Sequence, residues 1–181
     1  MNKLFLALLF TFTAQIALTQ IVWTDPAFPS QDENMTFFYN ASLGNGEVAS
    51  VVPMYIHTGV ITNVSTGPSD WQHVVGVWGT PDSDVLMTNE GDGIHSFDFN
   101  GQTLADFYSL DTDEVIEKIA CVFRNAAGTL VGREYDGNDI FYCMPEGAFS
   151  IQALTNVPAC GFVHVGDELD FTFLISENAD L

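Results

Sequence analysis

The sequence has very few positive charges: 4 Lys+Arg stand against 24 Asp+Glu, giving a formal net charge of −20 at pH 7. After Lys3 the cations are Lys118, Arg124 and Arg133 alone. Binding to DNA or RNA draws its affinity from clustered Lys and Arg that release counterions, so a nucleic-acid partner is excluded. Because acids are so abundant, we expect Arg124 and Arg133 each to pair with a carboxylate.

Cysteine is also scarce, with 3 residues in 181, which excludes a small fold held together by a dense disulfide framework. Cys121 and Cys143 lie in two segments that we expect to pair, and Cys160 is left over. Two alternatives stay open. Cys121 and Cys143 form a disulfide, or the cysteines are buried free thiols that pack as small apolar side chains.

Recognisable catalytic motifs are missing from the chain. It has no Gly-x-Ser-x-Gly elbow, no His-Glu-x-x-His motif, no phosphate-binding glycine loop and no Cys-x-x-Cys pair. Asp111, Asp113, Glu114 and Glu117 are close in sequence and could suggest a glycosidase pair. With so many acids some must fall close together, so we interpret these four as a solvated loop and strand edge. No catalytic residue is predicted.

Two acidic loops could bind a hard cation, because calcium takes oxygen ligands. They are Asp82-x-Asp84 and the run from Asp136 to Asp139. Neither follows the ligand spacing of an EF-hand, and short Asp/Asn turns account for both. We therefore predict no cofactor, with Ca²⁺ as the less favoured alternative.

Residues 1–20 have the pattern of an export signal: Lys3 is followed by a mostly apolar stretch that runs to Leu18. An uncleaved membrane anchor is the alternative, because no charge occurs from Leu4 to Thr24. Several Thr and Gln residues make the stretch a poor membrane helix. We expect a secreted, extracellular or outer-surface protein without a transmembrane segment in the mature chain.

From Ile21 onward no helical period lasts longer than about two turns, and short β-rich runs recur between Gly, Pro, Asn and Asp. One helical turn is expected within 103–110. The predicted strands are 35–41, 51–57, 71–78, 85–88, 94–99, 115–124 and 139–144. This pattern predicts an all-β fold, an immunoglobulin-like antiparallel β-sandwich over residues 21–145.

The strand pattern starts again after Pro145, with predicted strands at 149–154 and 168–175. Two or three strands cannot close a sandwich, and an isolated pair is marginal in water. We therefore interpret residues 146–181 as the first strands of a second immunoglobulin-like module, incomplete here, at the front of a longer polypeptide.

The segment from Val52 to Trp78 carries the best candidate for a binding surface. Side chains alternate along a strand, so Val52, Met54 and Ile56 are assigned to the core while Tyr55 and His57 point outward. A loop rich in Gly, Ser and Thr then leads to Trp71. We predict that Tyr55, His57 and Trp71 form an exposed aromatic platform. Trp78, which shares a strand face with Val74, is assigned to the core.

The order Tyr55-x-His57, then Trp71, is similar to the aromatic and histidine arrangement of the small starch-binding modules appended to bacterial amylases. Residues 22–145 as a whole resemble the N-terminal sandwich that precedes the catalytic barrel in secreted bacterial α-amylase-type glycoside hydrolases. The loop after His57 is longer here than in the simplest starch-binding modules. The segments that carry the wider resemblance are 25–29, 38–45, 55–59, 71–80, 122–125 and 136–142.

This resemblance implies a non-catalytic module that binds an α-glucan polysaccharide or oligosaccharide through Tyr55, His57 and Trp71. It also implies a catalytic domain further along the same polypeptide. The alternatives are a purely structural immunoglobulin-like spacer and an extracellular adhesion module, neither of which binds glycan.

Overall fold

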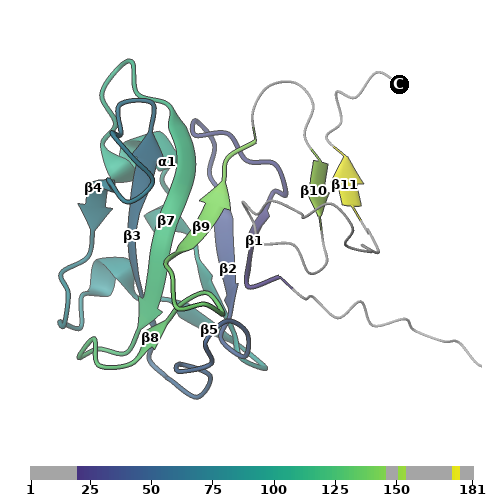
Figure 1. The fold of residues 1–181 in the computed structure, drawn as a ribbon, viewed down its shortest axis with the longest axis vertical. Helices are drawn as coiled ribbons and strands as arrows, with labels where there is room; N and C mark the ends of the chain where they lie inside the picture. Colours follow the sequence, from purple (N-terminus) through teal and green to yellow (C-terminus); the bar gives the residue numbers. More distant parts are fainter. Residues whose placement is uncertain (1–19, 146–150, 154–172, 176–181) are drawn as a thin grey trace, which may run out of the picture.

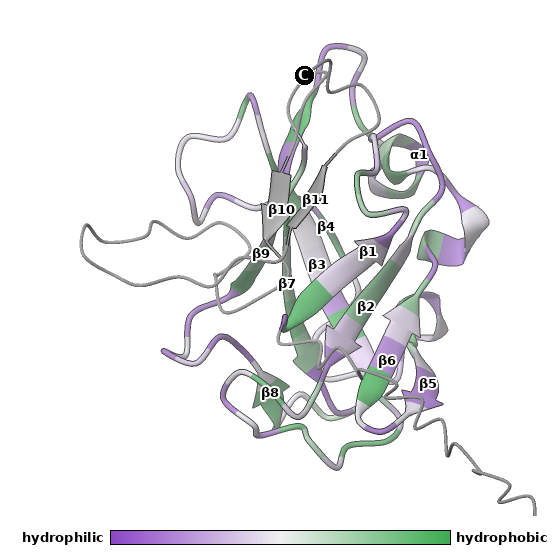
Figure 2. Cartoon of the chain, turned by 90° about the vertical axis from the view of Figure 1, so that its right-hand side faces the viewer, coloured by the Kyte–Doolittle hydropathy of each residue, from purple (hydrophilic) through white to green (hydrophobic). Residues whose placement is uncertain are grey.

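The computed structural model describes residues 20–145, 151–153 and 173–175, and over them the protein is an all-β sandwich of antiparallel sheets (Figure 1). The first sheet has the strand order β1-β2-β6-β5. Its strands are β1 (Val22–Asp25), β2 (Thr36–Asn40), β6 (Ile94–Phe97) and β5 (Thr88–Gly91). All four residues of β5 are exposed, and this edge strand is hydrophilic (Figure 2), which disfavours pairing with another chain.

The second sheet has the order β4-β3-β7-β8, with β9 also paired to β7. Its strands are β4 (Gln72–Val75), β3 (Tyr55–Thr62), β7 (Ile116–Arg124), β8 (Val131–Gly132) and β9 (Ile140–Cys143). The long strands β3 and β7 lie side by side in register, with Tyr55 opposite Arg124 and Ile61 opposite Lys118. They form the centre of this sheet, and every candidate binding residue lies on or beside them.

The core lies between the two sheets and follows from alternation along the strands. In β2, Phe37 and Tyr39 are fully buried while their neighbours are partly exposed. Tyr39 stacks on Phe123 of β7 with the ring planes 8° apart. Burial of such aromatic side chains is the main source of stability for a sandwich of this size.

One short helix, α1 (Leu104–Tyr108), confirms the helical turn expected within 103–110. The Thr103 side chain accepts a hydrogen bond from Asp106 N and so caps its start. The Tyr108 hydroxyl lies 2.7 Å from Thr58 Oγ1 in the sandwich interior. Two 3₁₀ turns, η1 (Ser83–Val85) and η2 (Phe99–Gly101), complete the elements of this region.

Most predicted strands are confirmed, and the differences have local causes. The run predicted at 85–88 is the end of η1 followed by the first residue of β5. Strand β3 begins at Tyr55 and continues through Thr62, so residues 58–62 of the segment predicted as loop are strand, while 63–70 are turns and bends. Strands β1 and β8, which have four and two residues, were not predicted.

The cysteine alternatives are resolved in favour of a free thiol at one position. Cys121 is a buried free cysteine on the core side of β7, and Cys143 is disulfide-bonded. A Cys121–Cys143 disulfide is therefore wrong. Cys160 lies outside the described residues.

Beyond the sandwich, β10 (Ile151–Ala153) and β11 (Phe173–Ile175) pair antiparallel, inside the two runs predicted as strands. The rest of 146–181 and the export signal predicted at 1–20 lie outside the described residues. Within the described ranges, no helix combines the length and apolarity that a membrane crossing requires.

Candidate functional site

The candidate site lies on the side of the second sheet that faces away from the core. Five aromatic side chains gather there, and we call them the aromatic face. They are Tyr55 and His57 of β3, Trp71 just before β4, Trp78 just after β4, and Phe141 of β9. They belong to different parts of the chain and meet because β3, β4, β7 and β9 are neighbours in one sheet.

His57 lies between the two tryptophans. Its ring centroid is 6.2 Å from that of Trp71, with the planes tilted by 31°, and 5.2 Å from that of Trp78, with the planes nearly perpendicular at 84°. The prediction that His57 and Trp71 lie together on the outer side of the sheet is consistent with this geometry. Trp71 in turn meets Phe141 edge to face at 6.5 Å.

Trp71 packs across β3 at a glycine. A Cβ placed on Gly59 would lie 3.4 Å from Trp71 Cε3 and only 2.9 Å from the Gln72 carbonyl oxygen. Because Gly59 has no side chain, the indole and the start of β4 can approach the backbone of β3 closely. Trp71 is partly buried.

Trp78 also packs against a glycine, and the prediction that it belongs to the core is wrong. Its side chain is 45% exposed, while a Cβ on Gly128 would approach the indole nitrogen to 2.7 Å. Strand β4 ends at Val75, and Gly76 has a φ of +92°. Strand alternation therefore does not extend to position 78.

Tyr55 lies on the predicted side of the sheet, but the prediction that it is exposed is wrong. It is 6% exposed and is part of the buried apolar cluster, and the guanidinium of Arg124 lies 5.3 Å from its ring centroid. Arg124 lies directly opposite Tyr55 in the sheet. The accessible part of the aromatic face thus consists of Trp71, His57 and Trp78, with Tyr55 underneath.

Arg124 itself is fully buried, and the prediction that it pairs with a carboxylate is wrong. Its Nη1 donates to the carbonyl oxygens of Thr80, Asn125 and Ala126, and its Nη2 donates to that of Val77, at 3.0–3.2 Å. Among the described residues, none of its nitrogens lies within 4.0 Å of a carboxylate. Burial lowers the pKa of Arg124, and the nearby charge of Asp82 opposes that shift.

The other arginine behaves as predicted. Arg133 forms an ion pair with Asp139, and about a third of each side chain is exposed. Surface pairs of this kind contribute little to stability. Arg124 ends β7, and Arg133 directly follows β8 of the same sheet. Arg124 is nevertheless fully buried, whereas Arg133 is partly exposed.

The surroundings of His57 favour the uncharged form of its ring. Burial lowers its pKa below the usual 6.5, the Arg124 charge lowers it further, and a hydrogen bond to the Gly76 backbone opposes both. Its Nδ1 is buried without a hydrogen-bond partner among the described residues. His57 thus contributes mainly a ring surface to the aromatic face.

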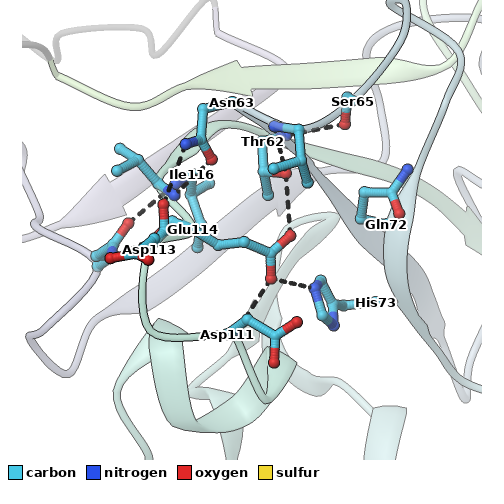
Figure 3. A network of polar contacts seen from close by, with 12 residues as sticks. Thr62, Asn63, Ser65, Gln72, His73, Asp111, Asp113, Glu114 and Ile116 are labelled. Atoms are coloured by element: carbon cyan, nitrogen blue, oxygen red, sulfur yellow. Dashed lines mark hydrogen bonds and ion pairs between the residues drawn. The ribbon is translucent and has the colours of Figure 1, made fainter.

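Glu114 is buried, so its interpretation as part of a solvated loop is wrong (Figure 3). Its Oε2 accepts hydrogen bonds from His73 Nε2 at 2.7 Å and from Asp111 N at 3.0 Å. Its Oε1 accepts one from the Thr62 hydroxyl at 3.2 Å. The Asp111 N–H is the main reason why the pKa of Glu114 lies below the usual 4.5, with His73 and Thr62 adding and burial opposing.

This Glu114 network joins β3, β4 and the segment before β7. His73 lies in β4, two residues after Trp71, and has a left-handed φ of +49°. Asn63 extends the network through hydrogen bonds to Asp113 O and Val115 N. Both carboxylate oxygens of Glu114 are thereby occupied, which favours a structural over a catalytic role.

The two acidic loops contain the expected turn chemistry. Asp82 accepts from Asp84 N, and Asp136 accepts from Asn138 N. No group of three or more His, Cys, Asp or Glu arranged to hold a metal occurs within the described residues. Comparisons with protein-family models and with curated proteins found no match to this chain.

Proposed function

We propose that this protein is a non-catalytic module that binds a neutral glycan, an α-glucan, on its aromatic face. The observation that carries the proposal is the pair of accessible indoles, Trp71 and Trp78, on either side of the His57 ring. Sugar rings present C–H groups on their faces, and such faces pack well against aromatic rings. Large accessible aromatics in one place are typical of a binding surface.

Each indole is supported from beneath by backbone instead of a side chain. Trp71 lies against Gly59 and Trp78 against Gly128. The rings are therefore fixed before any ligand arrives, so less conformational freedom is lost on binding. The Trp71 indole N–H can donate a hydrogen bond to a sugar hydroxyl, since it is Cε3 that packs against Gly59, and no covalent chemistry is needed.

The charge distribution supports a neutral ligand over an acidic one. Arg124 is fully buried and Arg133 is paired with Asp139. Lys118 lies 5.9 Å from the Phe141 ring centroid, at the side of the aromatic face away from Arg124 in the strand. With a formal net charge of −20, the protein repels uronate or sulfated polymers.

The proposal extends to context. The resemblance to sandwich modules of secreted α-amylase-type glycoside hydrolases suggests that the module keeps a catalytic domain of the same polypeptide close to its polysaccharide. A structural spacer is the alternative. An extracellular adhesion module is the other alternative; Val74 and Val77, which precede Trp78 in the chain, are exposed apolar residues.

Calorimetry with maltoheptaose and affinity electrophoresis in soluble starch test the proposal. Trp71→Ala and Trp78→Ala should each weaken binding by about tenfold or more, about 1.4 kcal/mol. Trp23→Ala is the matched control, because Trp23 stacks on Phe38 in the first sheet. Wild-type protein that is not retarded by starch, or variants that bind as well as it does, would leave the spacer as the function.

A further inference from the structure

The loop that carries Trp78 has few attachments of its own. Residues 77–80 close a small turn, in which the Thr80 hydroxyl donates to the Val77 carbonyl at 2.9 Å. Gly79 within it has a φ of +74°. Asp82 accepts a long hydrogen bond of 3.4 Å from Val77 N. These contacts shape the turn but do not join it to the sheet.

Arg124 makes that connection. It is the last residue of β7, and its guanidinium donates to the carbonyls at both ends of the turn, Val77 and Thr80, at 3.0 Å each. Its carbon Cζ lies 5.8 Å from the Trp78 ring centroid and 5.3 Å from that of Tyr55. The cation thus contacts both aromatic rings and also binds the backbone on either side of Trp78.

The geometry requires an arginine. Four carbonyls from two loops, 77–80 and 125–126, converge on one side chain. A guanidinium presents five N–H donors in a fixed plane and can reach acceptors on two sides. A lysine ammonium has three donors on a single atom and cannot span the same acceptors.

We infer that Arg124 is the positioning residue of the glycan site, holding Trp78 in its binding orientation through the carbonyls of Val77 and Thr80. This inference rests on the proposed function for its purpose. Arg124 is fully buried and does not touch the ligand, so its effect on binding is transmitted entirely by the 77–80 turn.

Fluorine NMR on protein labelled with 5-fluorotryptophan tests the inference directly. The chain has 3 Trp residues, so three resonances are expected and single Trp→Phe variants assign them. In Arg124→Met, the Trp78 resonance should shift toward that of the free amino acid and sharpen, while the Trp23 resonance stays in place. Arg124→Lys should show a smaller shift in the same direction. Arg133→Met, which also removes one positive charge, should leave all three unchanged.

Binding provides the second readout. Maltoheptaose affinity should fall about tenfold in Arg124→Met and be partly recovered in Arg124→Lys. An unmoved Trp78 resonance in folded Arg124→Met protein overturns the inference, whatever the affinity. A moved resonance in a protein whose wild type binds no glucan leaves the positioning role intact and refutes the proposed function alone.

A measurement on the wild type covers the case in which Arg124→Met does not fold. Four carbonyl acceptors should slow both the rotation of the Arg124 guanidinium and the exchange of its protons with water. Separate, slowly exchanging Nη resonances for one arginine are therefore expected in ¹⁵N spectra. Fast-averaged signals from both Arg124 and Arg133 would contradict the inference.

Discussion

The two ends of the aromatic face are held by buried charges of opposite sign, and the difference between them is instructive. At one end the cation Arg124 donates from its two Nη atoms to four backbone carbonyls and lies over two aromatic rings, while its Nε is buried without a hydrogen-bond partner among the described residues. At the other end the anion Glu114 is satisfied by a backbone N–H, a hydroxyl and the His73 imidazole. Glu114 is bound to His73, two residues after Trp71 in the chain, whereas Arg124 has no carboxylate within 4.0 Å among the described residues.

This contrast shows two solutions to the same problem. A buried charge is costly unless hydrogen bonds replace the lost water. Arg124 uses groups that carry no net charge, whereas Glu114 shares its position with a group that can gain or lose a proton. Neutral peptide carbonyls therefore bind Arg124 beside the turn that carries Trp78. The ionised carboxylate of Glu114 binds His73 in the strand that follows Trp71.

The largest loss of stability is expected when the Arg124 side chain, which binds the turn that carries Trp78, is replaced. Arg124→Met removes the donor to four buried or partly buried carbonyls, so the free energy of unfolding should fall by about 3 kcal/mol or more. Urea denaturation followed by circular dichroism measures it through the midpoint concentration. If Arg124→Met lost less free energy of unfolding than Glu114→Gln, the expected ranking of these two residues would be wrong.

Replacement of Glu114 should lower the free energy of unfolding by less than replacement of Arg124, and the loss should depend on pH. Glu114→Gln keeps the shape of the side chain but loses charge-assisted hydrogen bonds, at a cost of about 2 kcal/mol at pH 7. The pKa of Glu114 lies below the usual 4.5 in the folded protein. Its stabilisation is therefore fully present above about pH 4.5 and is lost as the pH falls through the lowered value.

Denaturation midpoints measured between pH 7 and pH 3 check this sign. The wild type should lose stability more steeply than Glu114→Gln below about pH 4.5, because only the wild type has a carboxylate at position 114 to protonate. Glu117→Gln, at an exposed position in the strand β7 that follows Glu114, is the control and should follow the wild type. Parallel curves for wild type and Glu114→Gln would show that Glu114 contributes no pH dependence.

A third variant displaces Trp71 without replacing Arg124 or Glu114. In Gly59→Ala the new methyl would lie 2.9 Å from the Gln72 carbonyl oxygen, so β4 and Trp71 must shift, at a cost of about 1–2 kcal/mol. Maltoheptaose binding should weaken while the fluorine resonance of Trp78 stays unchanged. Gly67→Ala is the matched control, since its methyl would meet nothing within 4 Å. Equal affinities in the two variants would contradict the role given to Gly59.

The smallest effect is expected at the exposed arginine. Arg133→Met breaks the ion pair with Asp139. About a third of each of these two side chains is exposed to solvent. Its cost should stay below about 1 kcal/mol, and added salt should reduce it further. A loss as large as that of Arg124→Met, measured by the same urea titration, would remove the distinction between the buried and the surface cation.

The sequence predicted the fold class because alternation is a local property. In β2 every second residue is buried, and β7 contains a continuous apolar run from Ile119 to Phe123; both patterns are typical of strands. The same rule placed His57 on the outer side of the sheet. It failed at Trp78 because β4 ends at Val75 and Gly76 has a positive φ. The pattern of residues does not show where that strand ends.

The missing parts of the site depend on contacts between distant residues. Glu114 meets His73 and Thr62, which are 41 and 52 positions away in the chain. Tyr55 lies against Arg124, its cross-strand neighbour. Neither contact leaves a local pattern, so burial of Glu114 and Tyr55 could not be predicted. Glycines at 59 and 128 were a usable signal, because a glycine within or beside a strand often marks close packing of another group.

The carbonyl shell around Arg124 has a consequence for the conditions under which the protein can work. Mobile ions weaken attractions between exposed charges, but they do not enter a fully buried contact between a guanidinium and peptide dipoles. Guanidinium groups also keep their proton over the whole biological range. In brine, or in an acidified medium that discharges surface carboxylates, the Trp78 half of the aromatic face should stay assembled and ready for ligand.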